Sequence, residues 1–248
     1  MSKMPDFISI IIPGYNEEKR IVQSLKGLSR FCEQHLETYE IVFVNDGSTD
    51  NTREIVESLA TPFLRTIHLE SNQGKGYAVR TGMLEARGHY RFFTDADLPY
   101  DLNAFLKGIK MFHATQCDVV GGARDLPESS DQSSQTLFRK LTSKCFSALV
   151  RFLLNVDVKD TQCGFKGFTA AAAEKLFSQS SIKGYAFDVE LFLLAGANNF
   201  HVSKIPVTLV RSGDSKIRMR VDVLLMVRDI LRLAVNSKFK NLNINFVI

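Results

Sequence analysis

The first half of the chain repeats one pattern, in which a short apolar run is followed by a turn and then by an amphipathic segment. The apolar runs predict strands over residues 7–12, 40–45, 64–69, 90–94 and 118–121. The segments between them predict helices over 17–31, with acids in its first turn, and over 52–60, 76–86 and 102–113. Strand–helix alternation of this kind predicts an α/β fold with a Rossmann-like, mainly parallel sheet covered by helices on both faces.

Length and composition limit the class of protein. The 248 residues suffice for one large domain or two small ones, and no repeat or linker divides them, so we expect a single domain over 1–248. A net charge of +4 is too weak to indicate a nucleic-acid partner, whereas anionic small molecules or an anionic membrane surface fit it. The four cysteines and five histidines show no metal-ligand spacing.

Several polar residues follow directly after the predicted strands. They are residues 13–17, Asp46, the pair Asp95 and Asp97, and Arg124. Ligands of parallel α/β sheets bind beyond the carboxyl ends of the strands, so we expect these residues to share one site.

Asp95 and Asp97 lie one residue apart at the end of the fourth apolar run, in RFFTDADLPYD. In an extended chain both carboxylates point to the same side, where they repel each other unless a cation lies between them. Oxygen ligands of this kind suit Mg²⁺ or Mn²⁺, and a diphosphate would complete the coordination shell. The alternative is a solvated turn with helix-capping acids.

A lysine between glycines, in NQGKG, precedes the third predicted helix. Lys75 in this position suits an anion at a helix N-terminus, although a simple tight turn explains the glycines as well. No GxxxxGK[ST] motif occurs, and GKGYAV lacks the third glycine of GxGxxG, so P-loop and classical dinucleotide sites are poor interpretations.

A family resemblance rests on several motifs in a fixed order. IIIPGYNEE, VFVNDGSTDNT, NQGKGYAVRTGM and FFTDADLPY together resemble family 2 glycosyltransferases, which have the glycosyltransferase A fold. The later stretches VVGGAR, FRKLTSK, DTQCGFKGF, GYAFDVELFLLA and RSGDSKI resemble the branch that makes polyprenyl-phosphate sugars. Within it, the dolichyl-phosphate β-glucosyltransferases match best and the mannose synthases next.

The resemblance implies roles for individual positions. It implies nucleotide-sugar binding by Pro13, Tyr15, Glu17, Val44, Asp46, Lys75, Asp95, Ala96, Asp97, Arg211 and Lys216. Asp95 and Asp97 match the diphosphate–metal motif, with Asp97 the expected direct ligand. Arg124 and Arg139 match positions near the acceptor phosphate. Asp188 and Glu190 fall where many relatives have an acceptor-side carboxylate. The candidate catalytic residues are Asp97 and Asp188. Asp188 would be a base for a hydroxyl acceptor, whereas with a phosphate acceptor it would orient the sugar or a basic neighbour; a helix-capping role explains Asp188 as well.

The implied reaction is an inverting, metal-dependent transfer of a hexose from a nucleoside-diphosphate sugar to a polyprenyl phosphate, dolichyl or undecaprenyl. We expect glucose and a UDP-sugar. Residues 1–122 would form the nucleotide-sugar half and residues 123–248 the acceptor half. One departure is Leu98-Pro99 after the acid pair, where mannose synthases commonly have a polar second residue. The alternatives are a soluble transferase that acts on a saccharide hydroxyl and a non-catalytic nucleotide-sugar-binding subunit.

A polyprenyl acceptor requires contact with a bilayer. Residues 137–154 combine an apolar stripe with four basic side chains, and Val221–Val235 flanks an apolar face with Arg228 and Arg232. Each segment predicts either an interfacial helix or a core helix with a solvated basic face. No run of 18 apolar residues occurs. We therefore expect peripheral attachment to the cytoplasmic face of a membrane, with the help of an anchoring subunit as an option.

Overall fold

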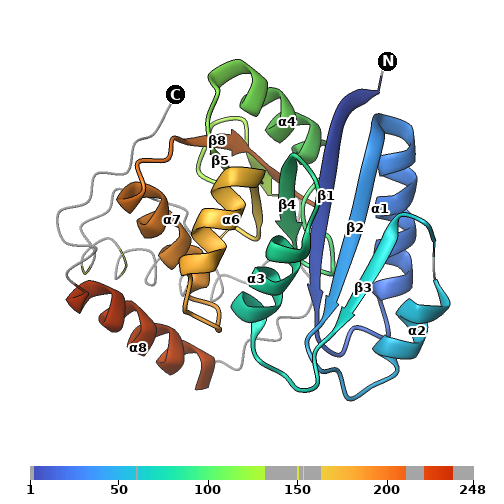
Figure 1. The fold of residues 1–248 in the computed structure, drawn as a ribbon, viewed down its shortest axis with the longest axis horizontal. Helices are drawn as coiled ribbons and strands as arrows, with labels where there is room; N and C mark the ends of the chain where they lie inside the picture. The colour runs from blue at the N-terminus through green and yellow to red at the C-terminus, as the bar shows by residue number, and fades with distance from the viewer. Residues whose placement is uncertain are drawn as a thin grey trace.

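The structure is a computed structural model that describes residues 3–59, 61–131, 150, 153, 163–210 and 221–236. Its main sheet has seven strands in the order β3-β2-β1-β4-β7-β5-β8 (Figure 1). The strands are β1 (Met4–Gly14), β2 (Leu36–Asn45), β3 (Leu64–His68), β4 (Tyr90–Thr94), β5 (Val119–Ala123), β7 (Phe165–Thr169) and β8 (Val202–Pro206). Only β7 runs antiparallel to its neighbours, β4 and β5. The predicted mainly parallel sheet is confirmed, and β6 (Ser130–Asp131) and β9 (Thr208–Leu209) form a second, two-stranded sheet.

Helices cover both faces of the main sheet. They are α1 (Ile21–His35), α2 (Thr52–Ser58), α3 (Lys75–Glu85), α4 (Asn103–Thr115), α6 (Ala170–Gln179), α7 (Phe187–Ala197) and α8 (Val221–Val235). Helices α3, α6, α7 and α8 share one hydrophobic core with the sheet, and α1, α2 and α4 share the other.

The period-2 alternation of the strands builds these two cores. Ile10 and Ile12 of β1 belong to the core under α1 and α4, whereas Ile11 belongs to the core under α3. On β4, Phe92 and Phe93 divide in the same way. Because both faces of each central strand are buried, the sequence shows continuous apolar runs rather than alternation with polar residues.

Two of the predicted boundaries near the site are wrong. The helix expected from residue 17 begins at Ile21, and its first turn contains no acid. Glu17 instead forms the turn before the helix, where its carbonyl oxygen accepts hydrogen bonds from the N–H groups of Arg20 and Ile21, at 3.0 and 2.9 Å. Pro13, expected after the first strand, lies within β1 because that strand continues to Gly14.

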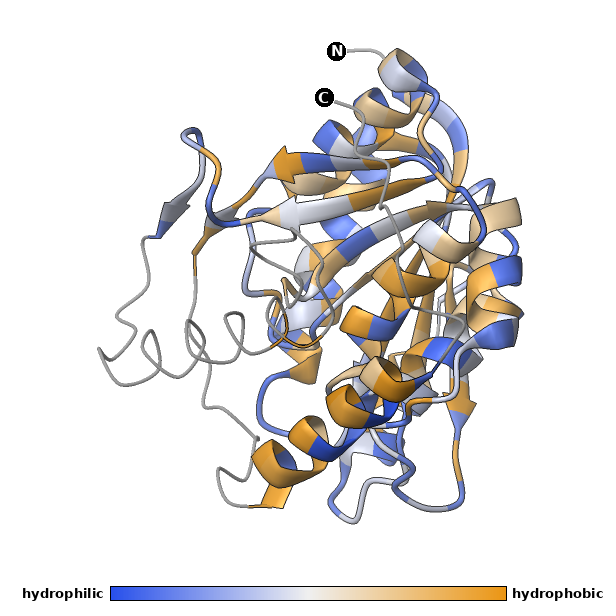
Figure 2. Cartoon of the chain, turned by 90° about the vertical axis from the view of Figure 1, so that its left-hand side faces the viewer, coloured by the Kyte–Doolittle hydropathy of each residue, from blue (hydrophilic) through white to orange (hydrophobic). Residues whose placement is uncertain are grey.

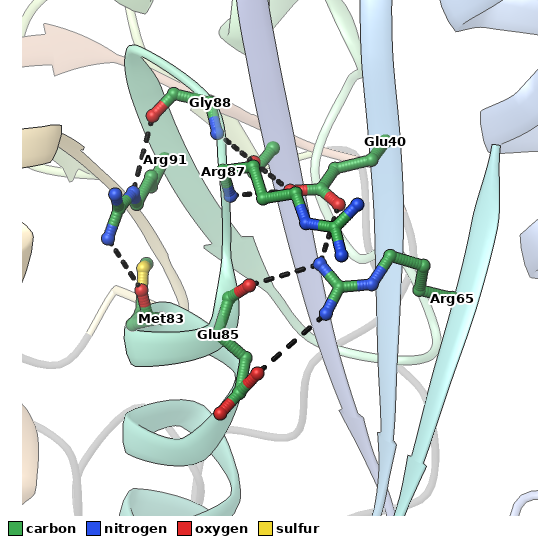
Figure 3. A network of polar contacts seen from close by, with 8 residues as sticks. Glu40, Arg65, Met83, Glu85, Arg87, Gly88 and Arg91 are labelled. Atoms are coloured by element: carbon green, nitrogen blue, oxygen red, sulfur yellow. Dashed lines mark hydrogen bonds and ion pairs between the residues drawn. The ribbon is translucent and has the colours of Figure 1, made fainter.

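A closed polar network lies near the amino ends of the central strands (Figure 3). The carboxylate of Glu40 accepts hydrogen bonds from the Ser9 hydroxyl at 2.7 Å, from the N–H of Arg87 at 2.7 Å and from the Arg65 guanidinium at 2.9 Å. Burial alone raises the pKa of Glu40, but these hydrogen bonds outweigh it, so the pKa is lowered. The network ties β1 and β2 to the turn between α3 and β4.

Candidate functional site

The loops after β1 and β2 are joined by hydrogen bonds at the carboxyl edge of the sheet. The N–H of Asn16 donates to the Ser48 hydroxyl at 2.9 Å, and the Asn16 side chain accepts from the N–H of Thr49 at 2.8 Å. The N–H of Glu17 donates to the Thr52 hydroxyl at 2.7 Å. Asn16 has a φ of 55°, a left-handed conformation that asparagine tolerates better than most residues. These bonds fix the loop that carries the predicted residues Tyr15 and Glu17.

Asp46 joins this pair of loops to the turn before α3. Its two carboxylate oxygens accept hydrogen bonds from the N–H groups of Gln73 and Gly74, at 2.8 and 2.9 Å. Gly74 has a φ of 102°, and a Cβ atom there would lie 2.6 Å from the carbonyl oxygen of Lys183, so glycine is required. Burial raises the pKa of Asp46 although both hydrogen bonds oppose it. The acid expected to contact the nucleoside thus also builds the turn that presents Lys75.

Lys75 forms an ion pair with Asp95 across the site. Its Nζ lies 2.5 Å from Oδ1 of Asp95, and both side chains are partly exposed. Burial lowers the pKa of Lys75, but the charges of Asp95 and Asp188 outweigh it and raise the pKa above its ordinary range. The carboxylate of Asp95 is seated against Gly164, where a Cβ atom would lie 2.3 Å from Oδ2. A lysine and an acid predicted from separate motifs are therefore in direct contact.

Asp97 lies beside Arg20 on the opposite side of the acid pair. Nη1 of Arg20 is 3.8 Å from Oδ2 of Asp97, and its Nε also bonds the carboxylate of Glu17. Burial and then the charge of Asp95 raise the pKa of Asp97. Both causes disfavour the charged form of this carboxylate, and the charge of Arg20 opposes them only in part.

Asp188 contacts a buried lysine that the sequence interpretation did not single out. Nζ of Lys166, on the central strand β7, lies 2.5 Å from Oδ1 of Asp188 and 2.8 Å from the carbonyl oxygen of Cys163. Both side chains are almost fully buried, and the ammonium group lies 5.6 Å and 5.4 Å from the ring centres of Phe93 and Phe192. Asp188 does not act as the cap of α7, whose N-cap residue Ala186 has no side-chain hydrogen bond.

Glu190 holds a loop rather than facing an open site. It accepts hydrogen bonds from the N–H and hydroxyl of Ser181, at 3.0 and 2.7 Å, and from the N–H of Ile182 at 2.9 Å. The same loop contacts α3, because the N–H of Tyr77 donates to the carbonyl oxygen of Lys183 at 3.2 Å. The predicted acceptor-side acid Glu190 thus supports the helix that carries Lys75.

Some of the other predicted residues lie in the described part of the chain, and some lie outside it. Pro13 and Val44 are buried neighbours on β1 and β2, Ala96 is buried between the two acids, and Tyr15 is partly exposed. Arg124 follows β5 directly and is exposed. The predicted residues Arg139, Arg211 and Lys216 lie outside the described part of the chain. Most of 137–154 also lies outside it; within that range Val150 and Leu153 are described, and both pack against the core.

The main chain at Leu98-Pro99 has a structural role. Leu98 adopts a φ of 45°, and the carbonyl oxygen of Pro99 accepts a hydrogen bond from the N–H of Val210 at 2.8 Å. A neighbouring bridge joins Tyr100 to Leu209. Although Pro99 offers no polar side chain, it fastens the residues after β8 beside the acid pair, one residue before the predicted Arg211.

Three residues of the site were missed by the sequence interpretation: Arg20, Gly164 and Lys166. Lys166 had a signal, because it interrupts the apolar stretch CGFKGF with a charge that burial makes costly unless it is paired. Arg20 stood in a segment expected to be a helix, and Gly164 in a motif quoted only for its resemblance. Their contacts with Asp97 and Asp95 depend on chain segments far apart in sequence.

The acid pair by itself is not a complete metal site. Within the residues that the structure describes, no group of three or more His, Cys, Asp or Glu side chains could hold a metal ion. Two carboxylates and their neighbouring cations are chemically suited to a divalent ion whose remaining ligands are phosphate oxygens and water.

Solved structures with the same fold include two that contain uridine nucleotides. Glucosyl-3-phosphoglycerate synthase from Mycobacterium tuberculosis, in complex with Mn²⁺, UDP and glucosyl-3-phosphoglycerate, superposes with a TM-score of 0.64 at 16% identity, over 94% of this chain and 80% of that one. Staphylococcus aureus TarS in complex with UDP-GlcNAc gives a TM-score of 0.58 at 19% identity, over 94% and 68%. At such low identity these likenesses establish the glycosyltransferase A-like fold alone.

Sequence relatives are closer. The chain is 34% identical over 240 residues to a dolichyl-phosphate beta-glucosyltransferase (ALG5C) of Trichomonas vaginalis, covering 92% of this chain and 71% of the relative. It is 32% identical over 245 residues to the dolichyl-phosphate beta-glucosyltransferase of Saccharomyces cerevisiae, and 35% over 238 residues to that of Drosophila melanogaster. These alignments cover 91% and 90% of this chain, and 73% of each relative. The family model for Glycosyl transferase family 2 matches residues 9–177. The chain therefore belongs to glycosyl transferase family 2.

Proposed function

We propose that this chain transfers glucose from UDP-glucose to the phosphate of a polyprenyl lipid, dolichyl phosphate in the first instance, with inversion at the anomeric carbon. The relatives named dolichyl-phosphate beta-glucosyltransferase support the sugar and the acceptor. The single observation that carries the proposal is the pair Asp95 and Asp97 at the carboxyl end of β4, with Lys75 against it. The division near residue 122 into a donor half and an acceptor half stays a prediction.

The residues present fit a divalent cation, Mg²⁺ or Mn²⁺. Asp97 and Asp95 would hold it, because their carboxylates are hard oxygen ligands and their mutual repulsion falls when a cation lies between them. Such an ion, when bound, offsets the charge that develops on a leaving diphosphate. Lys75, which the loop at 181–183 and the Asp46 turn hold in place, adds a protein cation beside the same group.

The acceptor phosphate needs positioning rather than deprotonation. Its second pKa is about 6, so it is largely dianionic at neutral pH and is already nucleophilic. Arg124, exposed at the end of β5, is suited to bind it, and Arg139 is a further candidate from outside the described residues. Asp188 is buried against Lys166, an arrangement that disfavours it as a base for a hydroxyl acceptor. This favours the lipid phosphate over the saccharide-hydroxyl alternative.

Helix α8 supplies the surface for the lipid side of the proposal. Its outward side chains are large and apolar, with Leu224 70% exposed and Val235 77% exposed, together with Val221, Leu225 and Leu231. Arg228 and Arg232 follow the same helical spacing and are also exposed. The opposite side packs Met226, Ile230 and Leu233 into the core, and Figure 2 shows how much of the helix is hydrophobic. The segment therefore packs into the core on one side and exposes apolar side chains on the other, while its role as a surface anchor stays a proposal.

We infer that α8 lies on a membrane surface, because apolar side chains enter the acyl boundary while arginines contact anionic headgroups. No helix of the described chain has the length and apolarity to cross a bilayer. A peripheral position on the cytoplasmic face, and an anchoring subunit, stay predictions.

The decisive experiment supplies radiolabelled UDP-glucose, GDP-mannose or UDP-N-acetylglucosamine with dolichyl phosphate to the purified protein, with and without a chelator. We expect label in the organic phase from UDP-glucose alone, its loss with chelator, and a β-anomeric product by NMR. Label that enters only water-soluble glycan would contradict the lipid acceptor, and label from another donor would contradict the sugar.

The membrane surface is tested by flotation with phosphatidylcholine vesicles, with and without phosphatidylserine. Leu224→Asp combined with Leu231→Asp should abolish flotation but leave UDP binding unchanged. The matched control is Leu84→Asp, an exposed leucine on α3 that is 40% accessible, and it should float like the wild type. Unchanged flotation of the α8 variant would remove α8 from the membrane contact.

A further inference from the structure

Each acid of the pair has its own protein cation. Lys75 pairs with Asp95 from the first turn of α3, and Arg20 pairs with Asp97 from the residue before α1. The cations approach from different elements. Arg20 is also shared with the buried carboxylate of Glu17.

We propose that Arg20 and Lys75 are displaceable counterions, so that a divalent cation binds Asp95 and Asp97 tightly only together with a diphosphate that accepts the two displaced side chains. Arg20 is thereby a further substrate-binding residue. The inference rests on the proposed function, in which these acids hold a metal ion, and it adds a coupling between metal and nucleotide.

The charges at the site support this coupling. Among the described residues of these ion pairs, the carboxylates of Glu17, Asp95 and Asp97 face the cations of Arg20 and Lys75, which leaves one net negative charge. A divalent ion alone turns this into one net positive charge, and it must also break the contact of 2.5 Å between Lys75 and Asp95. The diphosphate of a sugar nucleotide carries two negative charges and restores the original balance. Cations in a partly buried site are held more tightly when their charges are offset in this way.

The backbone around Arg20 allows the side chain to change partner. Helix α1 does not depend on this side chain, because Arg20 precedes the helix without a side-chain cap and its own N–H donates to Glu17. The Arg20 side chain is 27% exposed and that of Asp97 is 24% exposed, so both reach the solvent from which a ligand arrives. Arginine suits this exchange, since its planar group binds a carboxylate or a phosphate with the same geometry.

The test measures Mn²⁺ binding without nucleotide by electron paramagnetic resonance, and UDP binding in saturating Mn²⁺ by calorimetry. Arg20→Gln and Lys75→Met should each bind Mn²⁺ alone about three- to tenfold more tightly than the wild type, and bind UDP about tenfold more weakly. Arg20→Lys keeps the charge but loses the planar group, so Mn²⁺ alone should bind within about twofold of the wild type, while UDP should bind more weakly than to the wild type and more tightly than to Arg20→Gln. Arg53→Gln controls for the loss of an exposed arginine that pairs with Glu57 on α2, and it should change neither.

If Arg20 had only a structural role, its loss would weaken the binding of both Mn²⁺ and UDP. The counterion proposal instead predicts tighter Mn²⁺ binding together with weaker UDP binding. If Mn²⁺ alone binds Arg20→Gln no more tightly than the wild type, the counterion proposal is wrong. The variant Asp97→Asn distinguishes a failure of the counterion proposal from a failure of the proposed function. If that variant retains Mn²⁺-dependent UDP binding, the acids are not the metal site and the proposed function itself fails.

Discussion

Acidic side chains lie near both ends of the central strands, and their surroundings shift their pKa values in opposite directions. At the amino ends, Glu40 is satisfied by three donors from Ser9, Arg87 and Arg65, and its pKa is lowered (Figure 3). At the carboxyl ends, Asp97 has a raised pKa because burial and the neighbouring Asp95 disfavour its charge. The first network is complete within the protein. The group around Asp97 would be stabilised by a bound cation. A perturbed pKa of this kind is typical of a binding site and is not needed in a purely structural network.

The ion pair of Lys166 and Asp188 shows that a charged group close to the acid pair need not be part of a binding site. Lys166 and Asp188 lie beneath the acid pair, but they satisfy each other and the carbonyl oxygen of Cys163. Their contact holds the start of β7, where Gly164 seats the carboxylate of Asp95. The pair therefore supports the chain beside Asp95 from within the protein. The following predictions sharpen this contrast between satisfied and unsatisfied charges.

The largest effect should come from Asp97→Asn. We expect transfer to fall about 10³-fold, because the carboxylate that binds the metal is lost. The melting temperature should stay the same or rise by about 2 °C, because a repelled charge is removed. Transfer assays and thermal melts of the same preparation measure both. Substantial residual transfer would place the metal elsewhere.

Breaking the buried pair should cost the most stability. Lys166→Met leaves the charge of Asp188 buried without its partner, and we expect the free energy of unfolding to fall by roughly 3–5 kcal/mol. Urea denaturation measures it. Combining it with Asp188→Leu should recover part of the loss, because no uncompensated charge remains. A double variant no more stable than Lys166→Met alone would show that the pair is not the source of the effect.

The amino-end network should affect stability without affecting chemistry. Glu40→Gln weakens a charge-assisted contact with Arg65, so the free energy of unfolding should fall by roughly 1–3 kcal/mol. The kcat/KM for transfer should be unchanged at a temperature where both proteins are folded. A loss of kcat/KM in the folded variant would break the distinction between the two ends of the sheet.

The smallest effect is the pH dependence of the difference in unfolding free energy between the wild type and Glu40→Gln. The folded pKa of Glu40 lies below its ordinary value of 4.5, so the unfolded chain takes up the proton first as the pH falls. The contribution of Glu40 is therefore complete above pH 4.5 and is lost as the pH falls through the folded pKa. Urea titrations of wild type and Glu40→Gln should converge over this interval. A gap that persists in acid would assign the effect to packing rather than charge.

Much of the architecture followed from local pattern. Short apolar runs separated by amphipathic segments predicted five of the main-sheet strands and the helices between them, because strands buried on both faces need continuous apolar sequence. The bounds of α8 and the place of Asp95, Asp97 and Lys75 at the carboxyl edge followed from the same signals. The start of α1 did not, because Glu17 is held by Thr52, a contact between the loop after β1 and the first residue of α2.

The sequence by itself determined five strands of the main sheet, the acid pair at its edge and the family motifs, since period and residue type are local properties of the chain. Only the tertiary structure decided which charge meets which. Lys75 meets Asp95 and Arg20 meets Asp97, and each of these pairs joins segments that follow different strands. Lys166 meets Asp188, which joins β7 to α7. The physical reason is that the energy of a charge depends on its distance to every other charge and on its burial, and both are set by how the strands are ordered in space.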